Sequence, residues 1–336
     1  MGVQSNAFDF QFGFQASKGT PAANPTYYCR ALAGSTLEST RAWSKVMTGE
    51  GKRVPDGMAF ANQVTVAGSL KVAAQEKTLA AFLYGALGTD NVTGAGDPYA
   101  HAMTINQTGS LPYITIWKHI GTKYEVYSDC KIDKLTVTVS ATGDTRMVTI
   151  QADIKGIGIP LSKTSGPGTP ATDEGSTAYL WDYGTGAWKI DTVTTANISE
   201  MILTITNAVD AVPGESIVAY AAVEKVGEVQ ISSKQWAEDL TRYNTIKYGV
   251  SSPIDGAALS TVVPTGAFEC TLTKVAASPG PERSVKISVP STRYTVADPP
   301  LNPDPTGAPI YYTIAGYAIG ADPKITATVK CGLATL

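Results

Sequence analysis

The 336-residue chain has little charge of either sign. Charged residues make up 16% of it, whereas about a quarter is typical of soluble domains. The formal net charge is −3, and no run of Lys or Arg occurs. Because nucleic-acid affinity depends mainly on Lys and Arg contacts to phosphates, the composition argues against a function based on direct DNA binding.

The side chains that build catalytic and metal sites are also scarce. The only histidines are His101 and His119, and His119 lies in a strand-like segment where a structural role is favoured. The four cysteines form no CxxC pair, so the sequence gives no support for a zinc site. No dinucleotide-binding, Walker A or nucleophile-elbow motif occurs. We therefore predict that the protein is not an enzyme and has no metal and no cofactor.

Targeting signals are missing as well. The first ten residues, MGVQSNAFDF, lack the basic start and the apolar run of a secretory signal. No apolar run approaches the length of a membrane span. Scattered cysteines without a pairing pattern fit a reducing compartment, with most of the thiols packed in the core. We expect a protein that is made in the cytoplasm and has no membrane partner.

The chain is instead rich in residues that form strands and turns. It contains 32 Gly and 20 Pro, together with abundant Thr and Ser, a mixture typical of many short strands joined by turns. At roughly 100–200 residues per domain, the length predicts two domains. The fold class we expect is mainly β.

The spacing of apolar residues predicts where the strands and the helix of the first half lie. Alternating apolar residues from Phe8 to Phe14 predict a strand, and the segment 134–157 predicts a hairpin with its turn at 141–145. One helix is expected over 74–87, ending at Gly88. Its apolar face comprises Leu79, Phe82, Leu83 and Ala86. The polar stretch 35–57 has no clear period, and we interpret it as an extended loop or a long hairpin.

A change in composition suggests a domain boundary. Residues 161–186 are mostly Gly, Pro, Ser and Thr, which is typical of a linker or a long surface loop. We therefore expect a first domain at 1–160, a linker at 161–186 and a second domain at 187–336.

The second half of the sequence repeats the order of elements found in the first half. A glycine, a short alternating strand, a helix and a closing glycine follow one another from Gly68 and again from Gly227. In the second copy we expect Ser232 and Gln235 to form a capping box. The apolar face of that helix would comprise Trp236, Leu240 and Tyr243. Both halves also end in a strand, a turn, a strand and a glycine, at Gly156 and Gly332, so we infer a tandem duplication.

Three ordered segments resemble the tail tube (major tail) proteins of long-tailed, siphovirus-type bacteriophages. FQASKGTPAANPTYY, from Phe14, resembles the family's opening strand and Gly-Thr turn. The segment 79–121 is similar to the family's helix, excursion and returning strand, with a Leu-Pro step at Leu111 and Pro112. Residues 127–158 resemble the hairpin that closes the family's β-sandwich. The resemblance covers about residues 8–158, and the second half follows only through the duplication.

The resemblance implies a β-sandwich or barrel fold with one flanking helix per domain, and a structural role in the virion. Related subunits stack in rings to form a tube through which DNA passes without sequence-specific binding. It also implies contacts with other tail proteins: the tape measure, terminator and distal tail proteins. Two domains per chain would give trimeric, pseudo-hexameric rings, and hexameric rings are the alternative. The stretch 40–57 is the candidate inter-ring element, with Trp43 as an anchor and Arg53 as a polar contact.

Two other classes of function are alternatives. A carbohydrate-binding or adhesin-like β-sandwich module would explain the composition and the tryptophans, but not the duplicated strand–helix element or the missing signal. A hydrolase on a β scaffold would need a pair of carboxylates that sequence alone does not reveal, and no motif supports it.

Overall fold

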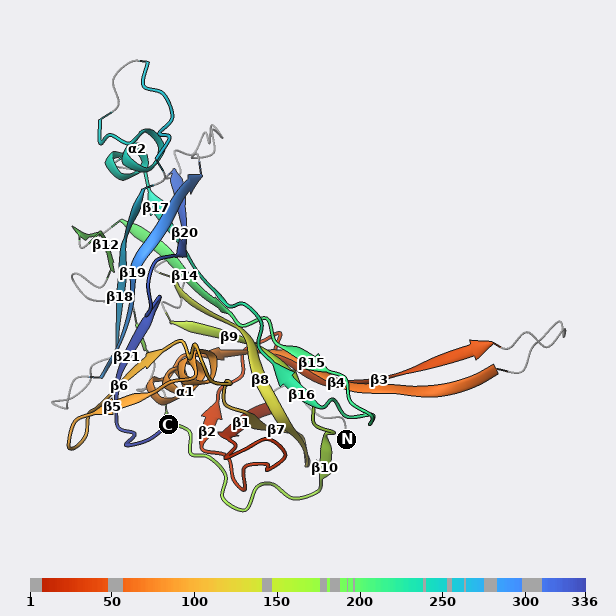
Figure 1. Ribbon diagram of the computed structural model, residues 1–336. Helices are drawn as coiled ribbons and strands as arrows, with labels where there is room; N and C mark the ends of the chain where they lie inside the picture. The colour runs from red at the N-terminus through yellow and green to blue at the C-terminus, as the bar shows by residue number, and fades with distance from the viewer. Residues whose placement is uncertain are drawn as a thin grey trace.

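The computed structural model shows a mainly β protein, as the sequence predicts, with a large antiparallel sheet that curves around one helix (Figure 1). The structure describes residues 8–47, 57–140, 147–175, 180–181, 188–191, 193–195, 197–237, 240–252, 256–262, 264–274, 283–297 and 310–336. Within these ranges there are two helices, one in each half of the sequence.

The first half contributes ten strands and the longer helix to the described residues. They are β1 (Phe8–Phe14), β2 (Tyr27–Cys29), β3 (Thr36–Met47), β4 (Gly57–Ala73), α1 (Glu76–Leu87), β5 (Asn91–Thr93), β6 (Tyr99–Thr104), β7 (Ile114–Ile120), β8 (Lys123–Ser140), β9 (Thr149–Gly156) and β10 (Leu161–Lys163). Hydrogen-bonded neighbours follow one another across the sheet in the order β3, β4, β9, β8, β7 and β1, and every pairing is antiparallel.

The second half contributes the remaining elements. They are β11 (Leu180–Trp181), β12 (Trp188–Ile190), β13 (Val193–Thr194), β14 (Ile198–Thr206), β15 (Asp210–Val212), β16 (Ala221–Val223), β17 (Glu228–Trp236), α2 (Thr241–Tyr248), β18 (Thr265–Lys274), β19 (Ser284–Ala297), β20 (Tyr311–Ala318) and β21 (Thr326–Cys331). Here the neighbours run β14, β17, β20, β19, β18 and β12. This is the same order as in the first half, strand for strand.

The two halves share one sheet network and one hydrophobic core. Strand β14 pairs with β8, and β21 pairs with β6, so hydrogen-bonded ladders cross from one half to the other. Helix α1 lies in the hollow of the sheet and packs against β2, β6, β8 and β21 (Figure 1). Ten of its twelve residues are buried, including all four residues of the predicted face, and Gly88 ends it in the left-handed conformation.

The second helix begins later in the chain than the sequence predicts. Ser232, Gln235 and Trp236 lie in strand β17, so the expected capping box is wrong, and α2 begins only at Thr241. Residues 228–236 alternate with a period of two, and this pattern outweighs the capping-box spacing. The inward Gln235 is accommodated because its Oε1 accepts a hydrogen bond from Tyr312 OH at 3.0 Å. Only Tyr243 of α2 is buried.

Two segments expected as irregular chain are partly ordered. Most of the stretch 35–57 that the structure describes belongs to strand β3, so the long-hairpin interpretation holds there and the loop interpretation does not. Residues 48–56 lie outside the described part. Of the expected linker, Leu161–Lys163 form β10 and pair with β8, because an exposed strand edge readily takes another strand.

Candidate assembly surfaces

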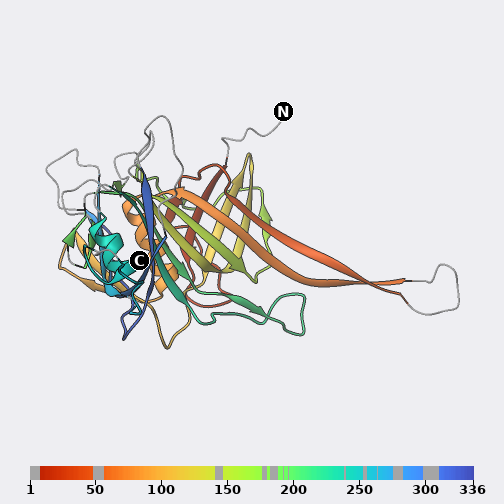
Figure 2. The ribbon, with the colours of Figure 1, turned by 90° about the horizontal axis from the view of Figure 1, so that it is seen from above.

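The feature that projects farthest is the hairpin of β3 and β4, which leaves the body of the protein as a long arm (Figures 1 and 2). Eleven residue pairs join the two strands, with an irregularity between Arg41 and Trp43. Trp43 is 65% exposed, and the Arg41 guanidinium lies 5.2 Å from the centre of its ring. A large aromatic side chain exposed on an arm is typical of a contact site.

Of the two residues proposed from sequence for this role, the structure places Trp43 on the arm. Arg53 lies outside the described residues, so the structure does not bring the two together.

The base of the arm is held tightly to the body. An added Cβ at Gly68 would lie 2.3 Å from the Thr36 carbonyl oxygen, so glycine is needed for the close approach of β3 and β4. Lys118 Nζ donates a hydrogen bond of 2.8 Å to the Leu37 carbonyl oxygen on the other edge of β3. The position at which the arm leaves the body is therefore fixed.

A second feature is the seam where β8 and β14 join the two halves. Seven residue pairs form it, from Glu200 opposite Ser140 to Thr206 opposite Lys134. The inward side chains on both strands are fully buried and apolar: Leu135, Val137, Val139, Met201, Leu203 and Ile205. The seam is thus a continuous part of the core.

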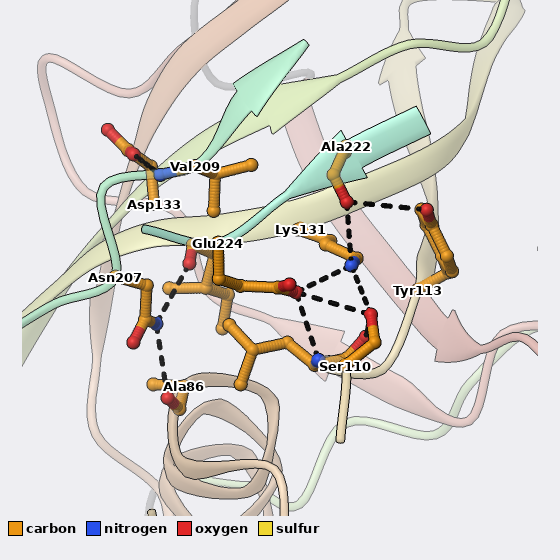
Figure 3. A network of polar contacts seen from close by, with 11 residues as sticks. Ala86, Ser110, Tyr113, Lys131, Asp133, Asn207, Val209, Ala222 and Glu224 are labelled. Carbon is orange, nitrogen blue, oxygen red and sulfur yellow. Dashed lines mark hydrogen bonds and ion pairs between the residues drawn. The ribbon is translucent and has the colours of Figure 1, made fainter. Parts of the chain in front are cut away.

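Beside this seam, a buried ion pair anchors the connection between β14 and β17 (Figure 3). The ammonium of Lys131 is fully buried and lies 2.5 Å from Glu224 Oε1. It also donates to Ser110 Oγ at 2.5 Å and to the Ala222 carbonyl oxygen at 2.9 Å. Tyr113 covers it, with the ring centre 4.3 Å from Nζ.

The electrostatics of this pair favour the ionised carboxylate. Burial raises the pKa of Glu224, but the hydrogen bond and charge of Lys131 and the backbone N–H of Leu111 outweigh burial, so the pKa lies below its ordinary value. The sequence analysis did not single out Lys131. A lysine flanked by apolar residues in a strand is a weak signal, and its partner lies 93 residues away.

The same connection makes further hydrogen bonds to the first half. Asn207 Nδ2 donates to the carbonyl oxygens of Ala86 and Ile132, each at 3.1 Å, and the Val209 N–H donates to Asp133 Oδ1 at 2.6 Å (Figure 3). The hairpin of β15 and β16 is therefore fixed against the first half, whereas the hairpin of β3 and β4 extends away from it.

The segment after β10 is also bound to the body. Arg30 Nε donates to Asp173 Oδ2 at 2.9 Å, and hydrogen bonding to Arg30 is the main reason why the pKa of Asp173 lies below its ordinary value. The next residue, Glu174, accepts from the backbone N–H groups of Lys77 and Thr78 at the start of α1, each at 3.3 Å. Helix N-termini favour such carboxylates, although burial raises the pKa of this one.

The histidines and cysteines, which are the candidates for catalysis or metal binding, are held in place by packing or polar contacts. His101 is fully buried, with Nδ1 2.8 Å from Asp90 Oδ2 and Nε2 2.8 Å from the Leu333 carbonyl oxygen. His119 stacks on Tyr124 with 4.4 Å between ring centres. The cysteines are all free and buried, as expected for thiols packed in the core. In the part of the chain that the structure describes, no group of three or more His, Cys, Asp or Glu residues could hold a metal ion.

Comparison with protein families identifies the chain. A family model described as phage tail tube protein matches residues 55–331, which span both halves. This chain belongs to the phage tail tube protein family. No similar sequence was found among curated proteins.

Membership extends the resemblance of the first half into the second. The phage tail tube protein is a structural component of the virion tail, and nothing in the match supports the carbohydrate-binding alternative. No helix among the described residues is long and apolar enough to cross a bilayer. The chain is thus a subunit that assembles with others into a tube, and the arm of β3 and β4 is its most projecting feature.

Proposed function

We propose that the chain builds the tube of a long-tailed phage as stacked closed rings, and that each chain supplies two tail-tube modules. The modules are residues 1–160 and 187–336, joined by 161–186. The repeated order of strand pairing carries this proposal, because β3, β4, β9, β8, β7 and β1 correspond one by one to β14, β17, β20, β19, β18 and β12. Closing a sheet into a ring removes its exposed edges.

The ladders also refine the correspondence inferred from the sequence. Ala73 pairs with Thr149 at the end of the β4–β9 ladder, and Trp236 pairs with Tyr311 at the end of β17–β20. In this alignment Gly68, opposite Ile154, matches Ile231, opposite Gly316, rather than Gly227. The closing hairpin of the first half, β8–β9, matches β19–β20 rather than β20–β21.

Three chains would supply six modules to a ring. If each module adds about four strands to the inner wall, about 24 strands at roughly 4.8 Å and a tilt near 40° give a circumference of about 150 Å and a backbone diameter of about 48 Å. That diameter leaves room for duplex DNA after inward side chains are added. Six chains with the second module outside the wall are the alternative.

Image reconstruction of tails or assembled tubes distinguishes the two arrangements. Three-fold rings with a pseudo-six-fold inner wall are expected. True six-fold rings with the second module on the outside would contradict the tandem arrangement of the wall.

The arm of β3 and β4 is proposed to contact the next ring, with Trp43 as the anchor and Arg53 as a polar contact. The substitution Trp43→Ala should leave the monomer folded and shorten or abolish tubes, as judged by negative-stain microscopy, while Trp117→Phe serves as a control in the core. Normal tubes from Trp43→Ala would remove Trp43 from the stacking contact.

The tube is proposed to act without catalysis or a cofactor, and to contact the tape measure, terminator and distal tail proteins. The low net charge supports passage of DNA without sequence-specific binding. Turnover of a glycan or ester by purified tubes, abolished by substitution of an Asp or His, would contradict this part of the proposal.

A further inference from the structure

The seam between β8 and β14 joins two modules inside one chain, and a counterpart of each strand lies at an open edge elsewhere. Strand β3 is the counterpart of β14, and among the described residues it pairs along one edge only, with β4. The end of β19 is the counterpart of the end of β8. Its residues Thr295, Val296 and Ala297 pair with β20, and no described strand pairs with their other edge.

We propose that β3 of one chain pairs with the end of β19 of a neighbouring chain, in the same register as the seam within the chain. This inference rests on the proposed ring assembly and specifies the contact that closes the ring. Its partner is a second copy of this chain.

The ladders fix the register. Ile205 of β14 lies opposite Val229 of β17, as Ser39 of β3 lies opposite Val66 of β4, so Ser39 is the counterpart of Ile205. Leu135 of β8 lies opposite Ala152 of β9, as Val296 lies opposite Ile314 of β20. Val296 is therefore the counterpart of Leu135.

Within the chain, Ile205 lies opposite Leu135, and Thr206 lies opposite Lys134. The same register between chains places Ser39 opposite Val296 and Thr40 opposite Thr295.

The backbone directions on β3 agree with this register. The Leu37 carbonyl oxygen accepts from Lys118 Nζ at 2.8 Å, while the Thr36 carbonyl oxygen lies toward Gly68 of β4. Backbone groups of successive strand residues point to opposite edges. The N–H and C=O of Ser39 therefore point to the open edge of β3, as those of Leu37 do.

The directions on β19 agree as well. The Tyr294 N–H donates to the Pro264 carbonyl oxygen at 3.1 Å, away from β20. By the same alternation, the N–H and C=O of Val296 point to the open edge of β19. Ser39 and Val296 thus both offer a donor and an acceptor, which is the requirement for a hydrogen-bonded antiparallel pair. A register shifted by one residue would fail this requirement.

Space for the neighbouring strand is present beside β3. A groove of about 840 Å³ follows the start of the strand and is lined by Leu32, Gly34, Ser35, Leu37, Glu38 and Lys118, among others. In the second half, the place next to β14 is filled by β8. The groove ends next to Ser39 along β3, and Glu38, its last lining residue on that strand, would lie opposite Ala297 in the proposed register.

A designed disulfide tests the register. Thr40 and Thr295 have exposed side chains, and they would form a non-hydrogen-bonded pair with about 4.5 Å between Cα atoms, within the range of disulfides. Tubes of the double variant Thr40→Cys, Thr295→Cys should give chain-to-chain cross-links after mild oxidation. On a non-reducing gel, the ladder should end at the number of chains in a ring.

Matched variants distinguish pairing in the proposed register from simple proximity of the two strands. Thr40→Cys with Arg293→Cys places the second thiol two residues out of register and should cross-link at least ten-fold less. Lys134→Cys with Thr206→Cys repeats the proposed geometry inside the chain and should close in the isolated subunit. Tubes that form but give no cross-link above the Arg293 control would overturn the pairing while leaving the proposed function intact. Failure of the unmodified chain to form tubes would instead contradict the proposed function.

A second variant covers the case in which the cysteine pair impairs assembly. Ser39→Pro removes an N–H that faces the open edge, so the monomer should fold with unchanged circular dichroism and form no rings. Ser39→Ala keeps the N–H and should assemble normally. Tubes from Ser39→Pro at the yield of Ser39→Ala would overturn the pairing of β3 with β19.

Discussion

Removal of the Glu224 carboxylate should destabilise the fold more than removal of its partner Lys131. The Lys131 ammonium is fully buried, whereas the Glu224 side chain retains 21% exposure. Glu224→Ala leaves a buried cation with the neutral oxygens of Ser110 and Ala222 and the ring of Tyr113. Breaking a buried pair in this way costs about 3–5 kcal/mol, and we expect about 3 kcal/mol because those two oxygens remain.

Lys131→Met keeps the volume of the side chain and removes the buried charge. The Glu224 carboxylate can then be hydrated, and the main loss is a donor to Ser110 and Ala222. Unsatisfied acceptors of this kind cost about 1–2 kcal/mol. The double variant Lys131→Met, Glu224→Ala should therefore be more stable than the sum of the two single changes predicts.

Acid should weaken the Lys131–Glu224 ion pair in the wild type. The folded pKa of Glu224 lies below its ordinary value of 4.5, so the carboxylate stabilises the fold above that value. This contribution is lost as the pH falls through the lower folded pKa. In Lys131→Met the acid sensitivity should shrink.

Urea unfolding followed by tryptophan fluorescence measures all of these differences at pH 7 and at several acid pH values. A cost below about 1 kcal/mol for Glu224→Ala would refute the reasoning. So would a larger cost for Lys131→Met than for Glu224→Ala.

Three further outcomes follow from the packing. Gly68→Ala should cost about 2 kcal/mol or more in urea unfolding, because its Cβ would meet the Thr36 carbonyl oxygen at 2.3 Å. Asp173→Ala should cost only about 1 kcal/mol, because the Arg30–Asp173 pair is about one-third exposed and partly screened by solvent. The four cysteines should not react with a thiol reagent in the folded chain and should all react in urea, because they are buried and burial raises the pKa of Cys331 to about 11.

Local patterns were enough to predict the elements whose packing follows their own periodicity. Leu79, Phe82, Leu83 and Ala86 are buried on α1, and Gly88 adopts the left-handed conformation that ends it. Leu135, Val137 and Val139 likewise face the core. In these segments, burial on one face agrees with local propensity, so the pattern determines the structure.

The prediction was wrong where two local patterns in the sequence favoured different structures. Residues 232–236 carry both a capping-box spacing and an alternating pattern, and pairing of β17 with β14 and β20 decides for the strand. The Lys131–Glu224 pair could not be predicted, because contacts between residues far apart in sequence leave no local pattern. The proposed alignment of the ladders matches Gly68 with Ile231 rather than with Gly227, because strand pairing defines the repeat and a glycine needed for one close approach is not needed in the other half.

The buried pair also gives the two halves different outer surfaces. In the first half, the connection between β3 and β4 is the projecting arm. In the second half, the matching connection between β14 and β17 carries β15 and β16, and it is held against the first half by Lys131, Asp133 and Asn207. A ring of three chains would therefore carry three arms rather than six, although its inner wall would be pseudo-six-fold. Two modules tethered in one chain would form their seam within the molecule, which would raise the effective concentration of β8 and β14 for each other. Reconstructed tubes should accordingly show arm density at three positions around each ring, and six equivalent arms would refute this asymmetry.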